Sequence, residues 1–169
     1  MKYTILSVLF TGIILLSGCS SKTADDYMKM AHENVMNKNI SEAINNYQTV
    51  VDQFPKTPRA PEALFQIATL YQNKMVENLS DTESFKKAEE TFRQVFNLYP
   101  DDQKAPMALF LSGFILANDL KNYESATSTY NLFLEKYPDH ELASSAREEL
   151  ENMGLSPDQI LHKKTQKNI

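Results

Sequence analysis

The sequence predicts an all-α fold, and two observations carry that prediction. The 169 residues include only four glycines and show no alternating runs rich in valine or threonine, whereas long stretches rich in Ala, Leu, Glu, Lys and Gln favour helix. Three segments, residues 43–55, 88–100 and 126–138, also repeat the same landmark residues at the same spacing. Because landmark residues that recur in this way along a chain are typical of stacked units, we expect a row of similar helical pairs.

The N-terminal residues 1–18 are predicted to be a secretion signal. Lys2 provides a positive head, residues 5–16 are almost all apolar, and Gly18 is a small residue before Cys19, the only cysteine. The apolar part is too short to span a bilayer. A secreted protein with one spare thiol is the alternative, but an unpaired exposed thiol is unfavourable in an oxidising compartment.

Each repeated segment has the spacing of a helix that ends at a proline. An alanine is followed by an aromatic residue after four positions, an apolar residue after seven and a second aromatic after eleven. These offsets place the four side chains on one helical stripe, and the next residue, proline, cannot continue the helix. The three sets are Ala43, Tyr47, Val50 and Phe54; Ala88, Phe92, Val95 and Tyr99; and Ala126, Tyr130, Phe133 and Tyr137.

Another helix is predicted before each of these segments, on apolar stripes around Ala31, Ala68 and Gly113. These small residues should let the second helix of each pair approach closely. The second pair carries extra polar sequence, and residues 73–84 are predicted to form a longer loop inside it.

The chain is predicted to close with a terminal helix over residues 141–153, which stops at Gly154. Its polar face would cap the array, and consists of Arg147, Glu148, Glu149 and Glu151. Residues 154–169 are predicted to be a basic tail, in which Ser156-Pro157-Asp158 could start one short turn. The end is expected to fray in solvent, and docking on an acidic partner or on lipid head groups is the alternative.

These landmarks resemble those of the tetratricopeptide repeat, a helix-turn-helix unit of about 34 residues. The resemblance implies a solenoid of about three repeats plus a C-terminal capping helix over residues 24–153. It also implies a partner-binding groove lined by positions two, five, nine and twelve of each first helix. In this chain those positions are Asp25, Met28, His32, Val35, Glu62, Phe65, Thr69, Gln72, Met107, Phe110, Phe114 and Ala117. The apolar last set is either covered by the capping helix or forms a recognition strip for a peptide.

The residues Leu16-Ser17-Gly18-Cys19 resemble the lipobox of bacterial lipoproteins. That resemblance implies cleavage before Cys19 and acylation of the cysteine, with palmitate among the attached chains, so that residues 19–23 form a lipidated tether. Ser20 and Ser21 follow the cysteine in place of an aspartate, which resembles the pattern sent to the outer membrane. The expected location is therefore the periplasmic face of the outer membrane.

Among lipoproteins with such repeats, the chain resembles the BamD (ComL) family of the outer-membrane β-barrel assembly machine. The shared features are the lipobox, the early start of the repeats and the junctions Phe54-Pro55…Ala63-Leu64 and Tyr99-Pro100…Ala108-Leu109. The resemblance implies a membrane-anchored scaffold that binds envelope proteins or peptides during β-barrel assembly and insertion. Lipoproteins of cell division, pilus assembly or peptidoglycan association remain alternatives.

The sequence indicates no catalytic chemistry. His32, His140 and His162 are far apart and match no metal-binding spacing, and neither a Gly-rich phosphate loop nor Gly-x-Ser-x-Gly occurs. The net charge of −5 does not suit nucleic acid. We therefore expect no enzyme activity, cofactor, metal site, nucleic acid or small-molecule substrate. The adjacent acids predicted to face solvent on helices are Glu89-Glu90 and Glu148-Glu149.

Overall fold

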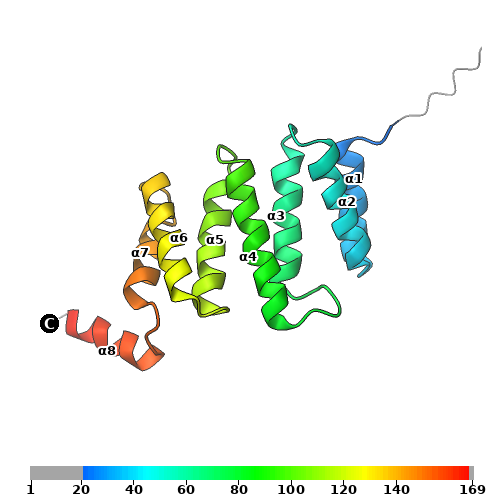
Figure 1. Cartoon of the computed structure of the whole chain (residues 1–169). Coiled ribbons are helices and arrows are strands. Elements are labelled where there is room, and N and C mark those ends of the chain that lie inside the picture. Colours follow the sequence, from blue (N-terminus) through cyan, green and yellow to red (C-terminus); the bar gives the residue numbers. More distant parts are fainter. Residues whose placement is uncertain (1–20, 168–169) are drawn as a thin grey trace, which may run out of the picture.

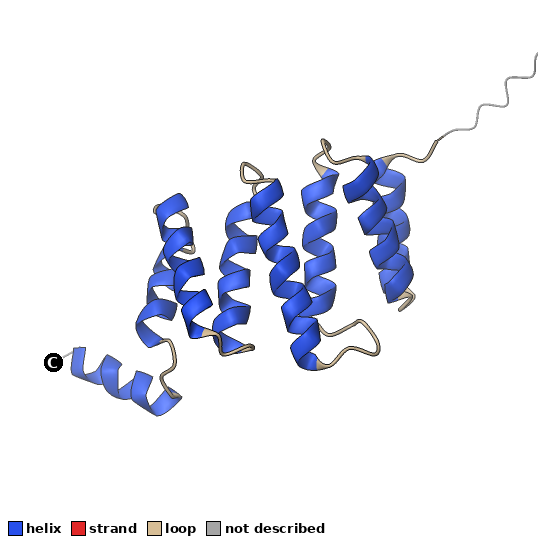
Figure 2. Ribbon diagram, viewed as in Figure 1, coloured by secondary structure: helices blue, strands red, loops and turns tan. Residues whose placement is uncertain are grey.

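The computed structural model describes residues 21–167, which form a row of helices (Figure 1). The predicted signal peptide and Cys19 lie outside these residues. The helices are α1 (Ala24–Met36), α2 (Ile40–Gln53), α3 (Arg59–Gln72), α4 (Asp81–Leu98), α5 (Ala105–Asn118), α6 (Tyr123–Lys136), α7 (Ala143–Asn152) and α8 (Pro157–Lys167). Figure 2 shows helices joined by loops throughout the described part, without strands. The predicted all-α class is confirmed.

Consecutive helices pack against each other from α1 to α7, and α1 also contacts α3. The helices therefore form three pairs, α1–α2, α3–α4 and α5–α6, with α7 packed against α6 as the predicted closing helix. Figure 1 shows the pairs side by side in chain order, with α8 projecting at the far end. A stack of this kind buries a continuous core between neighbouring units.

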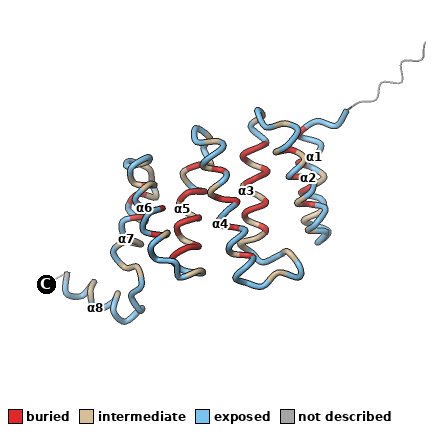
Figure 3. The backbone as a smooth tube through the Cα atoms, viewed as in Figure 1, coloured by how far each residue is buried: buried red, intermediate tan, exposed pale blue. Residues whose placement is uncertain are grey.

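The core consists of the landmark residues that the sequence repeats. In each pair the alanine, the aromatic residue and the apolar residue of the second helix are completely or almost completely buried, as are Ala31 and Ala68 of the first helices. The aromatic residue before each proline is half-buried. Figure 3 shows the buried positions along the facing sides of the helices, whereas the turns are exposed. The predicted stripes are therefore confirmed.

The loop inside the second pair is shorter than the sequence pattern predicts, because α4 begins at Asp81 rather than after residue 84. Ser80 is the N-cap of α4, and its hydroxyl accepts a hydrogen bond from the Glu83 amide at 3.2 Å. The Glu83 carboxylate in turn accepts one from the Ser80 amide at 2.9 Å. This reciprocal capping box satisfies two backbone donors and starts the helix early.

The C-terminal region is more ordered than predicted, because residues 157–167 form the complete helix α8 instead of a single turn. The Ser156 amide donates to the Gln159 side chain at 2.8 Å, which caps the first turn. Gly154, with φ of 76°, separates α7 from α8 in a conformation that suits glycine. Lys163 ties α8 back to α7 by donating to the carbonyl oxygen of Glu151 at 2.7 Å.

A polar cluster lies where α4, α5 and α6 meet, and it corrects the prediction for Glu89. The Glu89 side chain is only 13% exposed, and its Oε1 accepts hydrogen bonds from Arg93 at 2.9 Å and Ser112 at 2.8 Å. Arg93 also donates to Thr129 on α6 at 2.7 Å. Glu90, the neighbour of Glu89 in the sequence, is exposed, as predicted. Glu89 therefore links two helical pairs instead of facing solvent.

Candidate functional site

The predicted groove residues all lie on the first helices α1, α3 and α5, but two of them are buried. Met28 is 4% exposed and packs in the core shared by the first pair and α3. Ala117 is 5% exposed and belongs to the core that α5 shares with α6 and α7. Neither can contact a partner through its side chain, so the prediction is wrong for these two. The remaining ten are exposed or half-buried, and we refer to them as the first-helix face.

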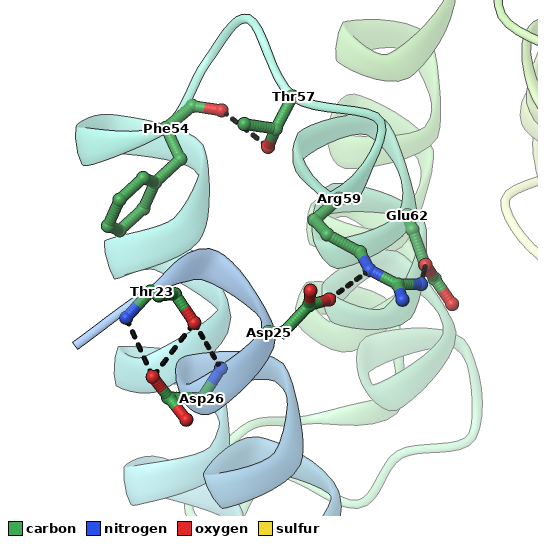
Figure 4. Close-up of polar contacts among 7 residues, drawn as sticks. All are labelled: Thr23, Asp25, Asp26, Phe54, Thr57, Arg59 and Glu62. Carbon is green, nitrogen blue, oxygen red and sulfur yellow. Dashed lines mark hydrogen bonds and ion pairs between the residues drawn. The ribbon is translucent and has the colours of Figure 1, made fainter.

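One end of the first-helix face is a charged cluster that bridges α1 and α3 (Figure 4). The Arg59 guanidinium donates from Nε to Asp25 at 2.6 Å and from Nη1 to Glu62 at 2.8 Å. Both hydrogen bonds raise the pKa of Arg59, and the bond to Glu62 makes the larger contribution. The sequence pattern identified both carboxylates but missed Arg59, because its bond to Asp25 joins residues that are far apart in the sequence. The sequence pattern did place the carboxylates of Asp25 and Glu62 on the same face, and such a pair indicates that a cationic side chain lies between them.

The exposed residue His32 follows on α1, and its ring packs edge-on against Tyr47 with centroids 5.6 Å apart. Val35, one turn further, is half-buried against the first core. Burial raises the pKa of Tyr47 to about 12, with a smaller contribution from Glu62. Tyr47 is therefore a neutral phenol near pH 7, which suits a packing role rather than acid–base chemistry.

The centre of the face, on α3, combines a ring with a cation. Phe65 is half-buried and packs edge-on against Phe92 with centroids 5.1 Å apart. The Lys104 ammonium lies 5.8 Å from the Phe65 ring centroid, within the range of a cation–π contact. Thr69 donates its hydroxyl hydrogen to the Phe65 carbonyl, and Gln72 is half-buried. Lys104 was missed because it precedes α5 and belongs to no helical stripe.

The far end of the face is apolar, because α5 carries no charged residue from Ala105 to Asn118. Met107 is 36% exposed. Phe110 is half-buried, with its ring 5.5 Å from Tyr130 and 5.9 Å from Phe133 on α6, and Phe114 is half-buried one turn later. The core therefore covers Ala117 and part of Phe110, and it leaves an apolar strip of Met107, Phe110 and Phe114 partly open to solvent.

Gly113 fixes the position of α5 against α6. A Cβ added at this glycine would lie 3.0 Å from Cε1 and 3.2 Å from Cδ1 and Cζ of Tyr130. The Tyr130 ring is completely buried, and its burial raises the pKa of the hydroxyl, with Glu149 adding a smaller effect. The predicted role of a small residue at this contact is therefore confirmed.

The residues that the structure describes contain neither a metal-ligand cluster nor a membrane-spanning helix. Within residues 21–167, no group of three or more His, Cys, Asp or Glu side chains is placed to hold a metal ion. The helices in this part of the chain are also too short or too polar to cross a membrane. What the arrangement can do is present an extended face with a charged end and an apolar end.

Comparison with known proteins agrees with this architecture. Residues 62–102 and 107–140 match the family model of the tetratricopeptide repeat, and they coincide with α3–α4 and α5–α6. The chain therefore contains tetratricopeptide repeats and folds as an all-α solenoid of that type. Such repeats generally serve as scaffolds for protein–protein interaction, through the extended surfaces of the stack. No curated protein matched the chain.

Proposed function

We propose that this protein is a membrane-anchored scaffold of the bacterial cell envelope, with a BamD-like role in the assembly of outer-membrane β-barrel proteins. The lipobox-like sequence before Cys19 supports a lipid anchor on that cysteine. The first helix begins at Ala24, so the repeats would lie close to the periplasmic face of the outer membrane. The proposal assigns the chain a binding role and no catalytic step.

The observation that carries the proposal is the partly exposed apolar strip on α5. Met107, Phe110 and Phe114 lie on a helix without charged residues, whereas the other end of the face holds the Asp25–Arg59–Glu62 cluster. A partner segment with apolar residues would cover the strip. Unfolded strands of membrane β-barrels meet this requirement, because their residues alternate between apolar and polar.

Peptide binding tests this proposal directly. We expect labelled peptides with the alternating pattern of β-barrel strands to bind in a fluorescence anisotropy titration. Permuted peptides of the same composition that lack the alternation should bind more weakly. Phe114→Ser should weaken binding about tenfold or more, the effect of removing an aromatic anchor. Phe114 is chosen because Phe110 also packs against the core.

The matched control is Leu98→Ser, which removes another exposed apolar side chain, from α4. It should leave peptide affinity unchanged. Equal affinity of Phe114→Ser and wild type would exclude the strip as the binding surface. In cells, depletion of the protein should lower the folded amounts of outer-membrane β-barrel proteins. Loss of pili or of septation with normal barrel levels would instead favour the alternatives given by the sequence.

A further inference from the structure

An apolar pocket lies at the N-terminal end of the solenoid, between the start of α1 and the turn that joins α2 to α3. Its volume is about 610 Å³, within the range of small-molecule sites. Phe54, Pro58 and Ala24 line it together with Lys22, Thr57 and Arg59. Figure 4 shows Phe54 and Thr57 on the turn side, facing the first residues of α1. The Thr57 hydroxyl donates to the Phe54 carbonyl at 2.8 Å and helps to hold the turn.

The carboxylates around this pocket are all engaged in hydrogen bonds. Asp26 accepts from the amide and the hydroxyl of Thr23, both at 2.8 Å. Asp25 and Glu62 accept from Arg59. Each acid at this end is therefore already bound to a donor of the protein itself.

Two lysines lie at this end of the solenoid, Lys22 in the pocket lining and Lys56 in the α2–α3 turn. Both are exposed, and neither forms a salt bridge within the described residues, although the charge of Lys22 helps to lower the pKa of Asp26. Lys22 lies with its ammonium 5.6 Å from the centroid of the Tyr27 ring, and Lys56 lies between Phe54 and Thr57 in the α2–α3 turn. On a chain with a net charge of −5, this end therefore presents one ammonium group at the apolar pocket and a second lysine on the adjoining turn.

We propose that residues 21–25 and 54–59 form the membrane-facing end of the protein and bind an anionic phospholipid of the bilayer. The pocket would take apolar atoms of the lipid beside Phe54, and Lys22 and Lys56 would contact its phosphate. The inference rests on the proposed anchor at Cys19. That residue precedes Ser21 by two positions, and two extended residues span at most about 7 Å.

Amide hydrogen exchange of the full chain in its lipidated form tests this inference. The protein is reconstituted into vesicles of phosphatidylcholine alone or of phosphatidylcholine with one third phosphatidylglycerol. We expect residues 54–59 to exchange about fivefold more slowly in the anionic vesicles, as one lysine at a charged surface would produce. Lys56→Glu should abolish this difference. As an exposed surface substitution, it should leave the fold intact.

The matched control is Lys38→Glu, which makes the same charge change in the turn between α1 and α2, at the other end of the same helices. It should retain the slower exchange of residues 54–59. Mass spectrometry of the starting protein separates the two proposals. A Cys19 without lipid would overturn the anchor, and this inference with it. A lipidated protein whose turn exchanges equally in both vesicles would overturn the inference alone, as would an equal effect of both substitutions.

Discussion

Glu89 and Glu90 are adjacent on α4 and chemically identical, yet we predict that their replacement by alanine has very different effects. Glu89 accepts hydrogen bonds from Arg93 and Ser112 and is 13% exposed, whereas Glu90 is exposed. The pair therefore compares a carboxylate inside a junction with one on the surface of the same helix turn.

The magnitude follows from the bonds that Glu89→Ala removes. Ser112 is completely buried, and a buried hydroxyl that loses its acceptor costs about 1–3 kcal/mol. The Arg93 side chain is 35% exposed, so water replaces part of its lost bond and the further cost is about 1 kcal/mol. We expect Glu89→Ala to lower the free energy of unfolding by about 2–4 kcal/mol. Glu90→Ala should change it by less than about 0.5 kcal/mol.

Urea denaturation followed by circular dichroism measures both variants against wild type. A loss of 3 kcal/mol corresponds to a decrease in melting temperature of about 6–12 °C for a chain of this size. The more conservative Glu89→Gln keeps one acceptor oxygen and should fall between alanine and wild type. Equal stability of Glu89→Ala and Glu90→Ala would refute the reasoning, because it would mean that the junction contributes nothing beyond a surface residue.

Two further predictions concern α5 and α4. Gly113→Ala gains about 1 kcal/mol of helix propensity, but it places a Cβ 3.0 Å from the buried Tyr130 ring, and this overpacking costs about 1–3 kcal/mol. We therefore expect the variant to be less stable than wild type in urea denaturation. A variant more stable than wild type would contradict the close contact. Ser80→Ala should cost about 1 kcal/mol by removing the N-cap of α4. The hydroxyl and the amide of Ser80 both donate to the Glu83 carboxylate and hold its pKa below the ordinary 4.5. The part of the stability that comes from the hydroxyl–carboxylate bond is complete above that pKa and is lost as the pH falls through the lower, folded-state value, whereas the bond from the Glu83 amide to the hydroxyl does not depend on pH. Stability measured from pH 7 to pH 3 should therefore show the difference between wild type and Ser80→Ala narrowing in acid, and a difference that stays constant would contradict the bond between the Ser80 hydroxyl and the Glu83 carboxylate.

The sequence predicts the helical pairs well because their landmarks recur at helical spacing, and the buried side of a helix is periodic. Ala43, Ala88 and Ala126 are all completely buried, as that period requires. The same period could not distinguish Glu89 from Glu90. What separates them is a hydroxyl on another helix, Ser112, and no local pattern around position 89 indicates that partner.

The first-helix face could be predicted by position but not by exposure. Met28, Phe65 and Phe110 occupy equivalent places, yet only Met28 is enclosed. A flexible methionine can fill an irregular gap between helices, whereas each phenylalanine ring packs against aromatic residues of the second helix of its own pair and keeps part of its surface exposed. Arg59 could not be derived from the repeat pattern, because its partners are defined by the approach of α1 to α3.

The rotation of α5 connects these observations to binding. A helix without charged residues could bury nearly the same apolar area in several rotations, so hydrophobicity alone does not determine which side of α5 faces the core. Ser112 and Gly113 remove this ambiguity, because Ser112 must reach Glu89 and only Gly113 lets the Tyr130 ring approach so closely. With those two contacts made, Met107 and Phe114 remain on the partly open side. The polar junction and the glycine therefore determine which apolar residues the solenoid offers to a partner.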